Sequence, residues 1–204
     1  MLGGARLLLG LLAVAASVLG CEPAWAHEQV GVAGGFLSGF SHPLFGPDHL
    51  IAMVAVGLWG AQLGRPLIWI LPITFPLVMA FGGLLGLMGV GLPFVEVAIA
   101  LSAIVLGVMV AFHVRPPAPA AAALVAAFAI FHGYAHGQEL PAAANPLAYS
   151  IGFVLSTGLL HLTGILIGLL LSWPMGRHAV RACGILVALL GGYFLATQMG
   201  VIGA

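Results

Sequence analysis

Charge is almost absent from this sequence of 204 residues. It has five arginines, five acidic residues and no lysine, so that charged residues make up 5% of the chain. Such a chain has no basic patch that could follow a phosphate backbone, and nucleic-acid binding is therefore excluded. Hydrophobic residues make up 62% and the mean hydropathy is +1.21, whereas about half of a soluble domain is apolar. The composition predicts an integral membrane protein embedded in a lipid bilayer.

The first 26 residues are typical of a secretory signal peptide. They contain Arg6, an apolar stretch at residues 7–19 and the small-x-small sequence Ala24-Trp25-Ala26. We therefore expect residues 1–26 to be removed, which leaves residues 27–204 as a polytopic transmembrane domain that begins at His27.

Cysteine is scarce as well. The sequence has two, Cys21 in the predicted leader and Cys183, so a processed chain has no pair for an intrachain disulfide. Cys183 is most simply a packing residue. Two other interpretations of the leader stay open: Val18-Leu19-Gly20-Cys21 has the form of a degraded lipobox with a lipidated Cys21, and the apolar stretch is also compatible with an uncleaved helix.

Proline, glycine and arginine divide the rest of the chain into apolar segments. A helix needs about 20 apolar residues to cross the hydrocarbon core. We therefore expect an all-α fold of about six transmembrane helices, preceded by an N-terminal half-helix at residues 30–41 that is too short to cross. The expected spans are residues 46–63, 67–90, 93–113, 118–137, 146–172 and 179–202.

Two prolines follow the half-helix. Proline breaks the interior of a helix but is tolerated in the first turn, so we predict a non-helical break from His42 to Pro47, after which Asp48 and His49 open the next helix. Irregular backbone at membrane depth is tolerated where protein or water lines it. The break therefore predicts a cavity.

Two short segments of this apolar chain each combine histidines with a carboxylate. SHPLFGPDHL contains His42, Asp48 and His49, and FHGYAHGQEL contains His132, His136 and Glu139. An ionisable side chain at mid-membrane costs at least ~2.5 kcal/mol, so such residues persist mainly where they line a polar site or pathway. The two histidines of the second segment lie four residues apart and the glutamate follows on the same stripe, so all three share one helix face.

The arginines predict an orientation. If the processed N-terminus lies on the periplasmic side of a bacterial cytoplasmic (inner) membrane, six spans place the remaining arginines in cytoplasmic connections, as the positive-inside rule requires, and return the C-terminus to the periplasm. These residues are Arg65, Arg115, Arg177 and Arg181. The same topology brings both polar segments and Glu96 to the outer end, as a single site would require.

The two segments provide four histidines and two carboxylates as candidate metal ligands. They contain no thiolate. Imidazole suits late transition metals, so we expect Ni²⁺ or Co²⁺ as a transported ion, with Zn²⁺ less favoured, and no prosthetic group. Three more residues are candidate ligands. His27 would gain a free amine on processing, His161 is either a deeper ligand or an interhelical hydrogen-bonding residue, and Glu96 either binds metal or reaches the interface.

The two segments resemble a known family. HPLFGPDHLIAMVAVGLWGAQLG and FHGYAHGQE are similar to the signatures of the HupE/UreJ family, hydrogenase and urease accessory proteins that act as nickel or cobalt permeases, and the resemblance covers essentially the whole mature chain. It implies that the six residues of the two segments select and pass the metal. A more distant resemblance is to nickel/cobalt transporters with four residues between His and Asp-His, whereas five separate His42 from Asp48 here.

Together these observations predict a permease that moves Ni²⁺ or Co²⁺ from periplasm to cytoplasm for hydrogenase or urease maturation, and not an enzyme. No nucleotide-binding motif is present, so this chain alone is not a pump. Two rivals stay open: an intramembrane zinc hydrolase that uses the same side chains, although HExxH is absent, and a metal sensor without transport.

Repeated small-xxx-small glycine pairs predict close helix packing. A homo-oligomer also stays open.

Overall fold

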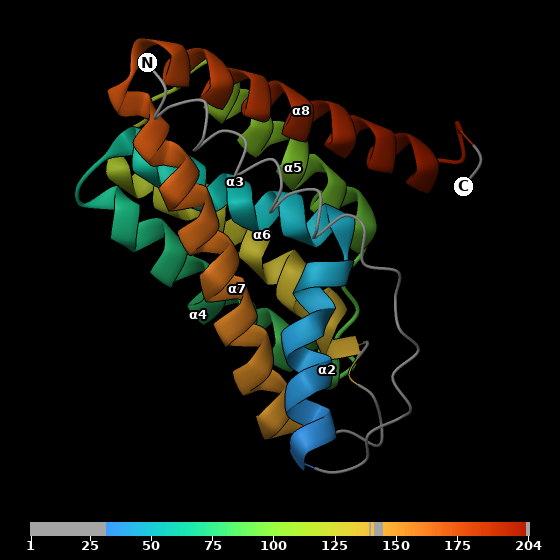
Figure 1. Ribbon diagram of the computed structural model, residues 1–204. Helices are drawn as coiled ribbons and strands as arrows, with labels where there is room; N and C mark the ends of the chain where they lie inside the picture. The colour runs from blue at the N-terminus through green and yellow to red at the C-terminus, as the bar shows by residue number, and fades with distance from the viewer. Residues whose placement is uncertain (1–31, 139, 141–144, 203–204) are drawn as a thin grey trace.

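The computed structural model describes residues 32–138, 140 and 145–202, and all regular structure within them is helical (Figure 1). The predicted leader, His27 and Glu139 lie outside these residues. The helices are α2 (Val32–Phe45), α3 (Pro47–Leu63), α4 (Leu67–Leu87), α5 (Val95–Ala111), α6 (Ala118–Gln138), α7 (Pro146–Gly168) and α8 (Pro174–Gln198), with the short 3-10 helix η1 (Leu169–Ser172) between the last two.

Most helix bounds fall close to those expected from the sequence. The largest difference at the start of a helix concerns α8, which begins at Pro174 instead of residue 179. Trp173 is its N-cap, and proline is favoured at the first helical position because its fixed φ suits the helix and no N–H is needed there.

The prediction of a non-helical break from His42 to Pro47 was wrong. Helix α2 continues through His42 and Pro43 to Phe45, and only Gly46 separates it from α3. The helical pattern passes the proline because the Gly46 N–H donates to the His42 carbonyl at 3.2 Å, while the Gly46 carbonyl accepts the first bond of α3 from the Leu50 N–H at 2.8 Å. The break is thus a bend of 79° between two helices rather than an irregular segment.

Four helices, α4, α6, α7 with η1, and α8, are long and apolar enough to cross a membrane. A fifth span results if the bent pair α2 and α3 counts as one, while α5 is apolar but has 17 residues. The expected count of about six is therefore not confirmed for the described residues. Large apolar side chains on the outward faces of the helices are exposed, as lipid contact requires. Examples are Leu77 on α4 and Leu159 on α7, at 68% and 52% exposure.

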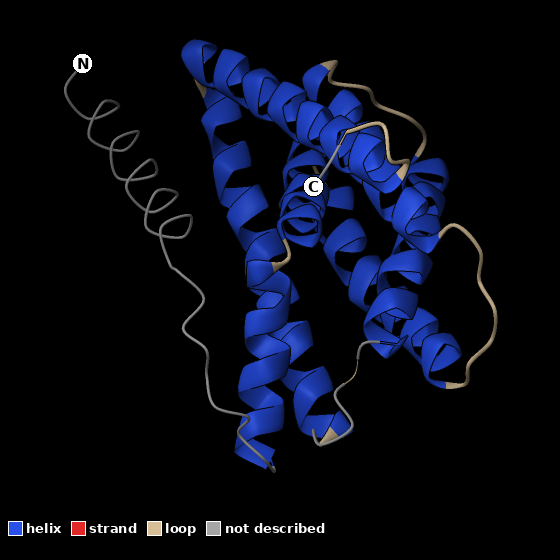
Figure 2. Cartoon of the chain, turned by 90° about the vertical axis from the view of Figure 1, so that its right-hand side faces the viewer, coloured by secondary structure: helices blue, strands red, loops and turns tan. Residues whose placement is uncertain are grey.

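Pairs of helices from distant parts of the sequence pack side by side. Helix α4 packs on α6 and α5 packs on α8, while α7 contacts both α2 and α3 (Figure 1). Figure 2 shows the same helices after a turn of 90°. Both helices of the bent pair, α2 and α3, therefore pack against α7. This arrangement places the bend next to the C-terminal end of α6 (Figure 1).

Glycines allow these helices to approach closely. A Cβ atom added to Gly133 on α6 would overlap the Met79 carbonyl of α4, one added to Gly39 on α2 would overlap the Tyr149 carbonyl of α7, and one added to Gly57 on α3 would overlap the His161 carbonyl. Small residues promote such contacts in membranes because helices there associate mainly by van der Waals packing and interhelical hydrogen bonds. Each contact lies within one helical turn of a histidine.

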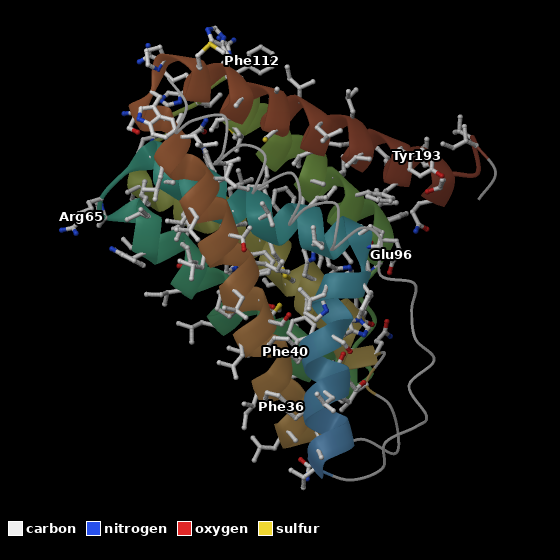
Figure 3. All side chains as sticks on the ribbon, in the orientation of Figure 1. Phe36, Phe40, Arg65, Glu96, Phe112 and Tyr193 are labelled. Atoms are coloured by element: carbon white, nitrogen blue, oxygen red, sulfur yellow. The ribbon has the colours of Figure 1, made fainter. Side chains whose placement is uncertain are left out.

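Arginine side chains lie where α3 and α5 end and α8 begins. A terminal amino group of Arg115 donates to the Gln62 carbonyl at 2.9 Å, and Arg181 Nε donates to the Ala111 carbonyl at 3.0 Å, so the ends of α3, α5 and α8 are joined there. Figure 3 shows Arg65 at the left of the molecule and Glu96 at the right.

Candidate metal site

The bend between α2 and α3 turns one polar segment into a compact group. His42 lies in the last turn of α2, and Asp48 and His49 lie in the first turn of α3. The carboxylate at the N-terminal end of α3 is favoured by the helix dipole. His42 and Asp48 are partly exposed, whereas His49 is buried.

The two polar segments meet. The His49 ring lies against both histidines of α6, with ring centroids 4.9 Å from His132 and 4.4 Å from His136. The His42 ring lies 4.9 Å from His136. We call His42, His49, His132 and His136 the four-histidine cluster. It joins the end of α2, the start of α3 and the end of α6, as the sequence-derived topology predicted.

Asp48 sets the tautomer of His49. The carboxylate Oδ1 lies 2.9 Å from His49 Nδ1 and also accepts the His49 backbone N–H at 2.9 Å. An ionised carboxylate only accepts, so Nδ1 carries a proton, and a metal can bind the ring only through Nε2. That Nε2 is buried and has no hydrogen-bond partner among the described residues. A carboxylate behind a bare imidazole nitrogen is the usual support of a metal-binding histidine.

A serine on α5, Ser102, determines the tautomer of His132. Ser102 Oγ donates to the Ile99 carbonyl at 2.6 Å, so its single proton is used, and it must accept from His132 Nε2 at 2.9 Å. Nδ1 of the neutral ring therefore bears the lone pair. It is fully buried and lacks a partner in the described part of the chain. No sequence pattern indicates this role, because one serine in an apolar helix is ordinary.

Aromatic side chains of α7 close the other side of the cluster. Phe153 lies 4.2 Å from His136 and 6.2 Å from His42 between ring centroids, and Tyr149 lies 6.1 Å from His42. A pocket of about 280 Å³ between α4, α6 and α7 reaches His136, and its walls are otherwise mostly apolar. Sequence inspection missed both aromatic residues because nothing in their spacing distinguishes them from residues that pack.

Two of the remaining candidate ligands, His161 and Glu96, lie within the described residues. His161, on α7, is buried and contacts Phe75 at 5.3 Å between ring centroids. Glu96 is exposed in the first turn of α5 (Figure 3). His27 and Glu139 fall outside the described residues.

The spacing of the cluster suits a shared ion, but the side chains do not yet form a metal site. Two imidazoles bound to one metal at about 2.1 Å have centroids roughly 5 Å apart, close to the separations of 4.4 to 4.9 Å seen here. As the side chains stand, however, no group of three or more His, Cys, Asp or Glu residues within residues 32–138, 140 and 145–202 could hold a metal ion. Binding therefore requires rotation of the rings.

Sequence comparisons point to one family. Residues 12–194 match the family described as HupE / UreJ protein. A curated relative, Protein HupE of Rhizobium leguminosarum bv. viciae, is 47% identical over 174 residues, which cover 85% of this chain and 91% of the relative. No solved structure matches the chain.

Proposed function

This chain belongs to the HupE / UreJ family of hydrogenase and urease accessory metal transporters, and from that membership we propose that it is a permease for Ni²⁺ or Co²⁺. The family consists of transporters and accessory proteins rather than enzymes, so the alternative of an intramembrane zinc hydrolase is set aside. The ion is the substrate, which the permease passes toward hydrogenase or urease maturation.

The choice of site rests on one observation: two buried imidazoles each have a ring nitrogen without a hydrogen-bond partner among the described residues. His49 and His132 are held by an oxygen on one ring nitrogen, while the other ring nitrogen is buried without a partner in the described chain. An unsatisfied buried polar group is costly, and structures retain few of them. A passing cation supplies the missing partner. We assign the cluster, together with Asp48 and Glu139, as the ion-binding group.

The donor set favours nickel or cobalt. Imidazole nitrogens dominate it, and the described thiol, Cys183, belongs to α8 rather than to the site. Thiolate-rich sites favour zinc and Cu(I), whereas a nitrogen-rich site with carboxylates suits Ni²⁺ and Co²⁺. Because affinity for nickel exceeds that for cobalt in most such sites, we propose Ni²⁺ as the preferred ion.

The exposure of the ligands suggests an order of events. Asp48 and His49 side chains are 26% and 11% exposed, and His132 is completely buried. A hydrated ion entering from the periplasm would first meet Asp48 and His42, then exchange water for the buried imidazoles as the rings turn. We place both termini in the periplasm and the arginine-rich end in the cytoplasm, in accordance with the positive-inside rule. Moderate affinity is needed, because an ion held too tightly cannot leave.

Uptake by the purified protein in liposomes tests the function. Ni²⁺, Co²⁺ and Zn²⁺ supplied alone and in competition should give the highest initial rate for Ni²⁺, then Co²⁺. His132→Ala should abolish uptake without loss of membrane insertion, because it removes a buried ligand. His178→Ala is the matched control, since that histidine is exposed on α8. Uptake by His132→Ala at the wild-type rate would contradict the proposed site.

A further inference from the structure

We propose that Phe75 is a gate between the four-histidine cluster and a second ion position at His161, which an ion occupies after it leaves the cluster. The inner position consists of His161 and Thr157 on α7. The proposal rests on the proposed function, because it describes the next step along the path of the same ion.

His161 is prepared as a ligand in the same way as His49 and His132. Its Nδ1 lies 2.8 Å from the Met53 carbonyl of α3, and a carbonyl can only accept, so Nδ1 carries the proton. The Nε2 lone pair is then buried, with the residue 1% exposed, and has no hydrogen-bond partner among the described residues. A purely structural interhelical histidine would need only the first of these two features.

Two hydroxyls near His161 are unsatisfied as well. Thr157 precedes it by one helical turn, and Oγ of Ser156 and Oγ1 of Thr157 are both fully buried without a partner in the described part of the chain. Hydroxyls in apolar helices usually bond back to a carbonyl of the previous turn. Ser150 and Thr163 on the same helix do so, at 2.8 and 2.9 Å. The contrast marks one stretch of α7 as prepared for a polar occupant.

Phe75 is the group that both histidines share. Its ring is fully buried on α4, with centroids 5.4 Å from His132 and 5.3 Å from His161, and it meets both imidazoles edge to face. A phenyl ring offers no ligand to a divalent cation that has shed water. In the proposed path, an ion passes from His132 to His161 only when this ring moves aside.

The backbone around Phe75 is suited to movement. Helix α4 contains Pro72 and Pro76, which bracket Phe75. Each proline lacks the N–H that would bond to the preceding turn, so this part of α4 has fewer backbone hydrogen bonds than an ordinary helix. Phe75 therefore lies on a part of α4 that has fewer backbone hydrogen bonds, although its side chain is tightly packed.

The inner position is tested with Co²⁺ and Ni²⁺ on the full-length protein. His161→Asn keeps an amide N–H in place of Nδ1 for the Met53 carbonyl but removes the Nε2 ligand, so the fold is preserved. We expect its Ni²⁺ uptake in liposomes to fall by at least about tenfold. At saturating Co²⁺, the visible absorption bands should report two bound ions in the unmodified protein and one in the variant.

Two results would overturn the inner position. One is uptake by His161→Asn at the rate of the unmodified protein, and the other is loss of both Co²⁺ ions, which would make His161 a structural residue. Absence of any uptake by the unmodified protein would instead contradict the proposed function itself.

The gate is tested by changing its size. Phe75→Ala should raise the initial rate of Ni²⁺ uptake above that of the unmodified protein, and Phe75→Trp should lower it. Leu71→Ala is the matched control for cavity formation, because Leu71 is equally buried one turn earlier on α4. If both Phe75 variants behave as Leu71→Ala does, Phe75 is not a gate.

Discussion

His49 and His136 come from different helices, α3 and α6, yet their ring centroids lie 4.4 Å apart. The bend after α2 and the close contact of α6 with α4 produce this proximity. It turns two short polar segments into one cluster inside an apolar protein.

Asp48→Asn should impair uptake although it removes only a charge. The carboxylate fixes the proton on His49 Nδ1, and an amide can instead donate to that nitrogen and reverse the tautomer. Loss of such a supporting partner typically costs about 10- to 100-fold in metal affinity or activity. We expect a decrease of this size in Ni²⁺ uptake from dilute solution. Asp48→Glu should retain more activity, and equal rates for Asp48→Asn and the unmodified protein would exclude the supporting role.

Ser102→Ala should weaken metal binding through His132. The serine accepts the His132 Nε2–H at 2.9 Å, and without it the buried ring has no partner to hold its orientation. The Ni²⁺ concentration for half-maximal uptake should rise by about tenfold. Ser150→Ala on α7, an exposed hydroxyl that bonds within its own helix, is the control. An unchanged half-maximal concentration in Ser102→Ala would show that His132 does not depend on the serine.

Gly133→Ala should destabilise the protein, whereas Gly158→Ala should not. A methyl group at position 133 would overlap the Met79 carbonyl of α4, but at position 158 it would meet no atom within 4 Å. Overpacking of this kind costs typically about 1 to 3 kcal/mol. Thermal unfolding in detergent should show a lower midpoint for the first variant and an unchanged or higher one for the second. Similar midpoints would argue against the close α4–α6 contact.

Arg115→Gln should raise the pKa of His113, which lies outside the membrane-spanning helices. Partial burial and the guanidinium groups of Arg115 and Arg181 lower that pKa, because all three disfavour the protonated ring. Arg115 Nε also donates to His113 Nε2 at 2.9 Å, a bond that only the unprotonated nitrogen can accept. Nuclear magnetic resonance titration of His113 should give a higher midpoint in the variant than in Arg65→Gln. Identical midpoints would contradict the placement of Arg115.

Much of the fold was predictable because the chain must satisfy its backbone in lipid. Apolar length and proline positions placed most helices within a few residues, and the orientation required by the arginines brought His49 and His132 to one end. The proline rule failed at Pro43, because a proline close to the end of a helix removes one bond without preventing the next. The expected six spans were not confirmed, because the bent pair α2 and α3 forms one span at most and α5 has 17 residues.

The supporting residues could not be predicted from the sequence. Ser102 and Phe75 are ordinary in apolar helices, and their roles depend on which helix lies opposite them. Helix pairing is decided by glycine contacts between segments far apart in the chain, such as Gly57 against the His161 carbonyl. No local pattern encodes that pairing. Composition and spacing therefore identified the candidate ligands, while their tautomers required the structure.

The central claim is that both polar segments bind the same ion. X-ray absorption spectroscopy of the Ni²⁺-loaded protein measures it most directly, because scattering from imidazole rings reports how many histidines bind the metal. We predict at least three in the unmodified protein, one fewer in His49→Ala and one fewer in His132→Ala, with no change in His178→Ala. An imidazole count that either His49→Ala or His132→Ala leaves unchanged would contradict the claim.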